Sequence, residues 1–185
     1  MDLTDLPDNL PAPVDDGAAD HLLSTRLPDI ELPSTGGEAI AISQLPGLVV
    51  YYLYPMTGRP DTPLPNNWDQ IPGARGCTPQ SCSFRDHHAE LTALNTRVFG
   101  LSVQTTRYQQ EAKARLHLPF ELLSDTQLEL KQRLQLPTFE VDAMELYKRI
   151  TLIAMNGNIV KVFYPVFPPG ENANDVMAWL QSHFA

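Results

Sequence analysis

The sequence predicts an α/β fold in which a mixed central sheet is flanked by helices. Predicted strands and helices alternate between residues 48 and 135, an Asn-Gly turn at 156–157 indicates a late β-hairpin, and a helix closes the chain. This order of elements is typical of parallel strands with crossover helices, to which a hairpin adds antiparallel strands. The 185 residues suffice for one compact core. We therefore expect a single domain over 21–185, preceded by a mobile, acidic and proline-rich arm over 1–20.

The first elements are an N-terminal hairpin and a central strand. Short apolar runs flank the sequence STGG at 34–37, and this pattern predicts a hairpin within 28–46. The run LVVYYLY at 48–54 is β-branched and aromatic and ends at Pro55, which is typical of a strand covered on both faces. Residues 56–76 contain four prolines and three glycines, so we expect a long irregular loop. A substrate lid, an oligomer contact and surface decoration are all open as its purpose.

The later elements follow from apolar spacing. Apolar residues recur at helical spacing from Thr78 to about Leu94, so we predict one helix here with Thr78 or Ser81 as its N-cap. This prediction places Cys77 at or just before a helix N-terminus. The other predicted elements are strands at 97–104, 119–124, 149–154 and 158–164 and helices at 106–118, 127–135 and about 172–182.

Charge and composition disfavour several classes of function. The formal net charge of −9 would repel nucleic acid and anionic membrane surfaces. No run of about 18 apolar residues predicts a membrane-spanning helix. The first twenty residues lack the basic and apolar regions of a secretory signal, so we expect a cytoplasmic protein.

Two cysteines, Cys77 and Cys82, carry the chemical signal of the sequence. Two are too few for a secreted disulfide scaffold, and in a reducing compartment such a pair indicates redox chemistry or metal binding. The four residues between them do not match the spacing of zinc knuckles, so we expect no metal. A cluster of both cysteines with His87 and His88 is the alternative.

A cysteine is nucleophilic as a thiolate, which must be stabilised. A free thiol has a pKa of about 8.5, and lowering this value to about 6 takes about 3.4 kcal/mol. A helix N-terminus supplies at most about 2 kcal/mol. A cation or additional hydrogen-bond donors are therefore needed, and Arg75, Arg85 and Arg149 are the candidate sources.

The spacing of the cysteines predicts a conformational change on oxidation. Residues i and i+5 of an ideal helix have Cα atoms about 8.6 Å apart, whereas a disulfide needs less than about 7 Å. If Cys77 and Cys82 lie on one helix, its first turns must unwind before they can bond.

The segment GCTPQSCSFRDHHAEL at 76–91 closely resembles the active-site segment of the Q-type peroxiredoxins, also called bacterioferritin-comigratory proteins, of the alkyl hydroperoxide reductase/thiol-specific antioxidant family. Further segments resemble that family's hairpin, core strands and late arginine-bearing hairpin: LPDIELPSTGGEAIAISQLPG, LVVYYLYP, VFGLSVQT, LPFELLSD and RITLIAMNGNIVKVF. The resemblance covers roughly residues 27–184 and implies a thioredoxin-like fold.

The resemblance also implies roles for individual residues. Cys77 resembles the peroxidatic cysteine and Cys82 the resolving cysteine. Arg149 resembles the arginine that holds the thiolate and orients the peroxide. Pro55 resembles the proline that opens the family's P-x-x-x-[TS]-x-x-C motif.

One departure from the family concerns the hydroxyl of that motif. The third residue before Cys77 is Ala74 instead of Thr or Ser, and the loop after Pro55 is much longer than the motif allows. Thr57 is our first candidate for the missing hydroxyl, and Thr62 is the second.

The function implied by the resemblance is a thiol-dependent peroxidase that reduces hydrogen peroxide or organic hydroperoxides without a cofactor. Cys77 would become a sulfenic acid and form a disulfide with Cys82, and thioredoxin or a glutaredoxin-like dithiol would reduce it. A redox-sensing or binding module switched by the same disulfide is the alternative. A protein disulfide oxidoreductase is disfavoured because the chain lacks C-x-x-C. A monomer and a dimer are both open.

Overall fold

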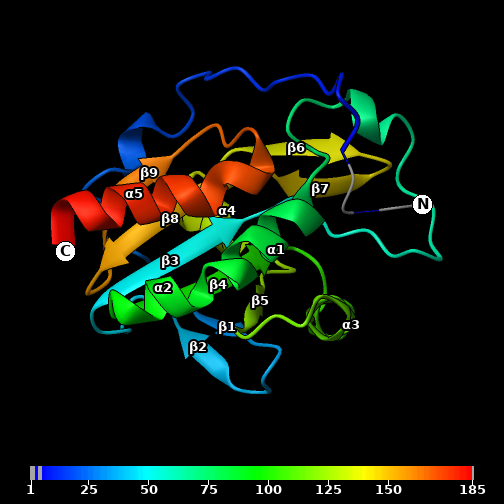
Figure 1. Cartoon of the computed structure of the whole chain (residues 1–185). Coiled ribbons are helices and arrows are strands. Elements are labelled where there is room, and N and C mark those ends of the chain that lie inside the picture. The colour runs from blue at the N-terminus through cyan, green and yellow to red at the C-terminus, as the bar shows by residue number, and fades with distance from the viewer. Residues whose placement is uncertain (1–2, 4–5, 185) are drawn as a thin grey trace.

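A computed structural model describes residues 3 and 6–184. Its main sheet has five strands in the order β5-β4-β3-β8-β9 (Figure 1). The strands are β3 (Leu48–Leu53), β4 (Thr96–Ser102), β5 (Leu122–Ser124), β8 (Ile150–Met155) and β9 (Asn158–Phe163). Strands β3, β4 and β5 run parallel, whereas β8 and β9 are antiparallel to their neighbours. The predicted mixed sheet is confirmed.

The run at 48–54 forms β3, the middle strand of the sheet, and all six residues of this strand are buried. Their side chains alternate between two cores. One core receives Val50 and Tyr52 and is covered by helices, whereas the other receives Val49 and Tyr51. The sheet is thus covered on both faces, as predicted.

Helices cover the two faces unequally (Figure 1). Four helices contribute to the core of Val50 and Tyr52, namely α1 (Cys77–Asp86), α2 (His88–Ala93), α3 (Thr106–Leu116) and α5 (Asn172–Phe184). The opposite core is closed by α4 (Glu129–Leu134), by the hairpin of β1 (Glu31–Pro33) and β2 (Ala39–Ala41), and by residues 19–30. The predicted N-terminal hairpin is confirmed.

The predicted helix from Thr78 to Leu94 is wrong in two respects. The helix starts at Cys77 with Gly76 as its N-cap, so neither Thr78 nor Ser81 caps it. It also breaks at His87, whose φ of −97° and ψ of 7° separate α1 from α2. At the break the His87 ring bonds the side chain of Asn174, which ties this point to α5.

A second hairpin, β6 (Thr138–Val141) with β7 (Met144–Tyr147), has no counterpart among the predicted elements. Its two turn residues, Asp142 and Ala143, have φ values of 46° and 61°. Such turns favour Asn-Gly or Asp-Gly, because glycine tolerates positive φ. Ala143 occupies the turn position at which a glycine would have predicted this hairpin from the sequence.

The predicted arm over 1–20 includes residues 1–2 and 4–5, which lie outside the described residues. Its later part contacts the domain. Asp16 accepts hydrogen bonds from the Lys148 ammonium at 2.7 Å and the Tyr164 hydroxyl at 2.8 Å, and Ala19 is buried in the core. The mobility of the arm stays a prediction.

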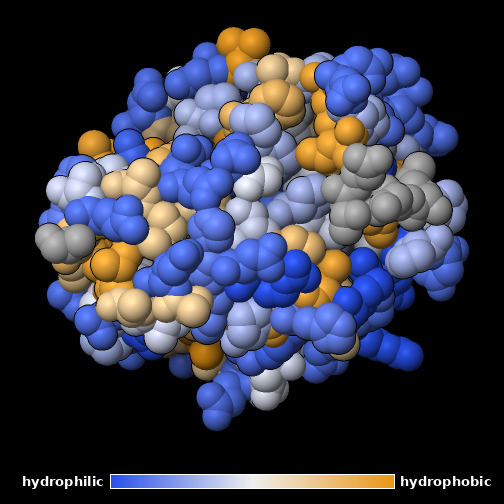
Figure 2. Space-filling model, in the orientation of Figure 1, coloured by the Kyte–Doolittle hydropathy of each residue, from blue (hydrophilic) through white to orange (hydrophobic). Residues whose placement is uncertain are grey.

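The face of the molecule seen in Figure 2 carries mostly hydrophilic side chains with scattered apolar ones. Among the residues that the structure describes, the exposed large apolar side chains are Val14, Leu23, Met144, Phe167 and Phe184. Within residues 3 and 6–184, no helix combines the length and apolar character needed to cross a membrane.

Candidate active site

Cys77 is the first residue of α1 and is 3% exposed. The thiol makes one long contact to the carbonyl oxygen of Ala74, at 3.7 Å. Because the first backbone N–H groups of a helix have no intrahelical acceptor, this position favours an anion. The prediction that Cys77 lies at a helix N-terminus is confirmed.

Gly76 allows the chain to enter α1 at this point. Its φ is 110°, a left-handed conformation in which a side chain is strained. A Cβ at Gly76 would also lie 2.2 Å from Pro169 Cγ. Cys77 is therefore placed by a close contact between Gly76 and the segment Pro169–Glu171 that precedes α5.

Arg149 supplies the cation beside the sulfur. It directly precedes β8, whose first residue, Ile150, pairs with Leu53 at the end of β3. The 54–76 segment that leads to Cys77 leaves the sheet at this same end, which brings the two side chains together. Arg149 Nη2 lies 3.2 Å from Cys77 Sγ, and the guanidinium is buried.

The remaining partners of Arg149 are neutral oxygen atoms. Nη2 also donates to the backbone carbonyls of Gly73, Ala74 and Arg75 at 3.2, 3.1 and 3.2 Å. Nη1 donates to the side-chain oxygen of Gln80. Among the described residues no carboxylate forms an ion pair with Arg149, so the guanidinium presents an unneutralised positive charge to the Cys77 sulfur.

Gln80 connects this arginine to α5. Its amide nitrogen donates to Asn172 Oδ1 at 2.9 Å, and the Thr151 hydroxyl donates to the same oxygen at 2.7 Å. All three side chains are buried. A buried polar chain thus runs from Cys77 through Arg149 and Gln80 to the first residue of α5.

Cys82 lies on the same helix, half-buried, and both cysteines are free thiols. Burial raises the pKa of Cys82, because it disfavours the thiolate, and the charge of Arg85 acts in the opposite direction. The helix is continuous between the two cysteines. This geometry is the one for which the spacing predicts unwinding before a disulfide forms.

The structure does not bring the predicted hydroxyls to the sulfur. Thr57 is buried, and its hydroxyl donates to Gln104 Oε1 at 3.1 Å. Thr62 is exposed, with its hydroxyl directed at Asp61. Pro55 is buried just beyond β3. No described hydrogen bond joins either threonine to Cys77.

The other candidate groups have partners elsewhere. Arg75 lies 3.4 Å from Asp69, and Arg85 pairs with Asp86 at 2.8 Å. His87 is bonded to Asn174. Across the described part of the chain, no three His, Cys, Asp or Glu side chains are grouped as metal ligands.

The sequence model of the Redoxin family matches residues 23–178. The chain belongs to the Redoxin family. It is 32% identical to peroxiredoxin bcp1 of Schizosaccharomyces pombe over 130 residues, which cover 68% of this chain and 58% of that protein. It is 27% identical to peroxiredoxin Bcp of Bacillus subtilis over 144 residues, which cover 75% of this chain and 82% of that protein. The match to a Coxiella burnetii peroxiredoxin bcp spans 57% of that relative.

Solved structures agree with this Redoxin assignment in fold. Peroxidoxin BcpB of Mycobacterium tuberculosis superposes with a TM-score of 0.72 at 22% identity and covers 88% of this chain and 98% of its own. Peroxiredoxin Q of Xanthomonas campestris superposes with a TM-score of 0.69 at 20% identity, and the match covers 88% of this chain and 99% of that protein. The thioredoxin-like fold and the resemblance to Q-type peroxiredoxins are confirmed.

Two polar residues of this Redoxin domain were not among the predicted site residues. Gln80 follows Cys77 by three positions, which places it on the same face of α1, so helical spacing could have identified it. Asn172 is 95 positions away from Cys77 in the chain. Nothing in its local sequence indicates that it meets Gln80.

Proposed function

We propose that the chain is a thiol-dependent peroxidase that reduces hydrogen peroxide or an organic hydroperoxide. The observation that carries the proposal is the 3.2 Å contact between the Arg149 guanidinium and the Cys77 sulfur at the start of α1. A cation and free helix N–H groups both favour a thiolate. Membership of the Redoxin family supports the same reaction.

In the first step the Cys77 thiolate attacks the distal oxygen of the peroxide. A sulfur–oxygen bond forms as the oxygen–oxygen bond breaks, and the departing RO⁻ takes a proton and leaves as ROH. Sulfur is oxidised to a sulfenic acid. We assign Arg149 the role of holding the thiolate and orienting the peroxide, because its side chain is fixed by three backbone carbonyls.

In the second step the Cys82 sulfur attacks the sulfenic sulfur and water leaves, which gives a Cys77–Cys82 disulfide. An external dithiol then reduces this bond by thiol–disulfide exchange, and we propose thioredoxin or a glutaredoxin-like protein. The sum is ROOH + 2 RSH → ROH + H2O + RSSR. A dithiol reductant of this kind places the reaction in a reducing compartment such as the cytoplasm.

The remaining site residues have supporting roles in the proposal. Pro55 lies two residues beyond the end of β3, where the chain leaves the sheet for the loop that leads to α1. For Thr57 to bond the peroxide, its hydroxyl must leave Gln104. We therefore propose that Arg149 and the first N–H groups of α1 bind the peroxide oxygens. Residues 21–185 would act as one domain in this reaction.

Stopped-flow oxidation of the reduced protein by hydrogen peroxide tests the proposal. The wild type should react far faster than free cysteine and consume peroxide continuously when a thioredoxin system is supplied. Cys77→Ser should lose both reactions, whereas Cys82→Ser should reduce one equivalent of peroxide and then over-oxidise.

The same measurement separates an enzyme from a redox-sensing module. A Cys77 that oxidises no faster than free cysteine would contradict the peroxidase. So would full turnover by Cys77→Ser. Formation of the disulfide without turnover would favour the sensor.

A further inference from the structure

The 56–76 loop covers the sulfur of the candidate active site. A cavity of about 10 Å³ reaches Cys77, and Thr78 and Gly76 form its inner wall. The other lining residues are Met56, Gly58, Leu64, Trp68 and Arg75 of the loop, together with Leu3 from the N-terminal segment. The direct approach to the sulfur is therefore narrow.

The size of this cavity limits what can reach Cys77. A single water molecule needs about 10–15 Å³, so the cavity holds about one. Hydrogen peroxide has two heavy atoms and would enter with small side-chain movements. A hydroperoxide with an aryl or branched alkyl group would have to displace the loop.

The loop is closely packed where it crosses the cavity. A Cβ at Gly58 would lie 2.9 Å from Leu64 Cδ2 and 3.0 Å from Leu3 Cδ2. These leucines fill the space that a side chain at Gly58 would occupy. The cover thus has no spare volume in which a bulky substituent could be accommodated.

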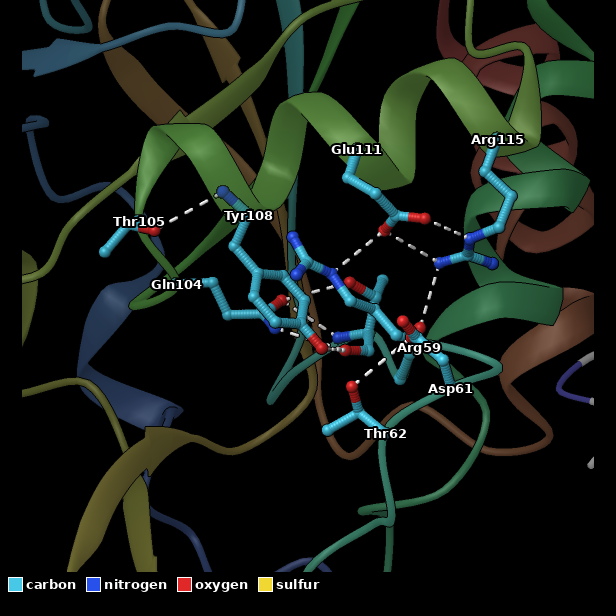
Figure 3. A network of polar contacts seen from close by, with 10 residues as sticks. Arg59, Asp61, Thr62, Gln104, Thr105, Tyr108, Glu111 and Arg115 are labelled. Atoms are coloured by element: carbon cyan, nitrogen blue, oxygen red, sulfur yellow. Dashed lines mark hydrogen bonds and ion pairs between the residues drawn. The ribbon is translucent and has the colours of Figure 1, made fainter.

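The start of the loop is held by a group of side chains that we call the clamp, namely Gln104, Tyr108, Glu111 and Arg115 (Figure 3). The Gln104 amide accepts from the backbone N–H of Thr57 at 2.9 Å and donates to the Thr57 carbonyl at 3.1 Å. The Tyr108 hydroxyl donates to the same carbonyl at 3.1 Å.

The clamp also holds the next two residues of the loop. Arg115 donates to the carbonyl of Gly58 at 2.9 Å. The Arg59 guanidinium lies 3.9 Å from the centre of the Tyr108 ring, and its Nε is 3.3 Å from Glu111 (Figure 3). Glu111 in turn pairs with Arg115 Nε at 2.7 Å.

Three consecutive residues, 57 to 59, are thus tied to α3 and to the segment before it. Gly58, which lines the cavity, is held in place by these contacts, and Met56 directly precedes the tied residues. Each contact must be broken before the loop can lift, so the contacts add to the barrier for a bulky substrate.

We propose that the clamp makes the site selective for hydrogen peroxide over bulky organic hydroperoxides, a specificity that rests on the proposed peroxidase function. Gln104, Tyr108 and Arg115 are positioning residues in this view, because they act through the loop and do not touch Cys77. Leu64 contributes directly, since it forms part of the wall over the sulfur.

The test is the ratio of two second-order rate constants for oxidation of the protein thiols, with hydrogen peroxide and with cumene hydroperoxide, by stopped flow. Wild type should react faster with hydrogen peroxide. Arg115→Gln and Tyr108→Phe should each shift the ratio toward cumene hydroperoxide by about three- to tenfold. Arg107→Gln is the matched control, because Arg107 is exposed on the same helix.

A second variant widens the cavity over Cys77 and leaves the clamp residues unchanged. Leu64→Ala removes side-chain volume over Cys77 and should shift the ratio in the same direction, whereas Leu23→Ala, at an exposed leucine, should not. If wild type reacts with neither peroxide faster than free cysteine does, the proposed function fails. If wild type reacts rapidly with hydrogen peroxide but Arg115→Gln and Leu64→Ala keep the ratio of their controls, the selectivity proposal alone is overturned.

Discussion

Arg149 and Gln80 form a buried hydrogen bond in which an uncharged amide oxygen holds the guanidinium beside Cys77. The amide leaves the positive charge unneutralised while fixing its direction. Asn172 continues this arrangement, although its own Nδ2 is buried without a partner. One amide side chain of α1 thus orients the cation together with the three backbone carbonyls that bind Nη2.

Gln80→Leu is expected to lower the free energy of unfolding by about 1–3 kcal/mol and to slow oxidation of Cys77 by peroxide. The substitution leaves Nη1 of Arg149 buried without an acceptor. Gln80→Glu restores an acceptor for Nη1, and a flipped Asn172 amide can donate its orphan Nδ2 to the carboxylate, so this variant should recover part of the lost stability. Its carboxylate also neutralises the guanidinium, so oxidation of Cys77 should stay slow. Urea unfolding and stopped-flow oxidation measure the two effects.

The control for these variants is Gln132→Leu, because Gln132 is exposed on α4. It should change the free energy of unfolding by no more than about 0.5 kcal/mol. Equal rates for Gln80→Leu and wild type would show that Arg149 is oriented without Gln80.

Formation of the Cys77–Cys82 disulfide is expected to unwind the start of α1. The backbone bond from Gln80 N to Gly76 O, 3.1 Å long, closes the first turn between these cysteines. Hydrogen exchange followed by mass spectrometry should show faster exchange over 77–86 in the oxidised protein than in the reduced one. Peroxide treatment of Cys82→Ser should leave exchange over this segment close to that of the reduced wild type. Unchanged protection in the disulfide form would contradict the expected unwinding.

Gly76→Ala is expected to destabilise the fold and displace Cys77. Alanine at this position would be strained by the φ of 110°, and its Cβ would lie 2.2 Å from Pro169 Cγ. Gly37→Ala is a matched control, because Gly37 has a φ of 94° but no atom within 4 Å of its added Cβ. The loss of unfolding free energy at Gly76 should exceed that at Gly37, where strain alone costs about 1 kcal/mol. Equal losses would show that Pro169 moves aside freely.

The contact between Asp16 and the domain should weaken in acid. Hydrogen bonds from the Lys148 ammonium, and then from the Tyr164 hydroxyl, lower the pKa of Asp16 from 3.8 to about 2. Because the pKa in the folded state is depressed, this stabilisation is present above about pH 4 and is lost as the pH falls toward 2. Asp16 is exposed to solvent, so the effect is at most about 1 kcal/mol.

Urea midpoints at pH 6, 4 and 2.5 test this dependence. Asp16→Asn should lower the midpoint at pH 6, and its difference from wild type should narrow at pH 2.5, whereas Asp8→Asn, at an exposed aspartate, should follow wild type throughout. Parallel curves for Asp16→Asn and wild type would contradict a stabilising role of the carboxylate.

Strong local patterns predicted most of the fold. The uninterrupted apolar run of β3 and the Asn156-Gly157 turn each identify an element by themselves. The hairpin of β6 and β7 escaped prediction because its turn lacks glycine. The break at His87 escaped for a different reason, since it coincides with a contact to Asn174, which is remote in sequence.

The site was predictable where its chemistry is local or where the family motif is intact. Cys77 opens a helix because of the sequence around it, and the resemblance identified Arg149 as its partner. The threonine or serine hydroxyl of the family's P-x-x-x-[TS]-x-x-C motif was harder to place, because a longer loop interrupts that motif in this chain. Thr57 meets Gln104, 47 positions away, and no spacing rule indicates that pairing.

Gln80 lies between the two cysteines and also bonds the first residue of α5. A disulfide that unwinds this turn would withdraw Gln80 from Asn172 as well as from Arg149. The last helix of the chain would then lose a tether whenever the sulfurs are oxidised. Trp179, which packs on α5 against the same core, offers an intrinsic fluorescence signal for that release. Oxidation of the two cysteine sulfurs would thus change the fluorescence of a tryptophan in the last helix.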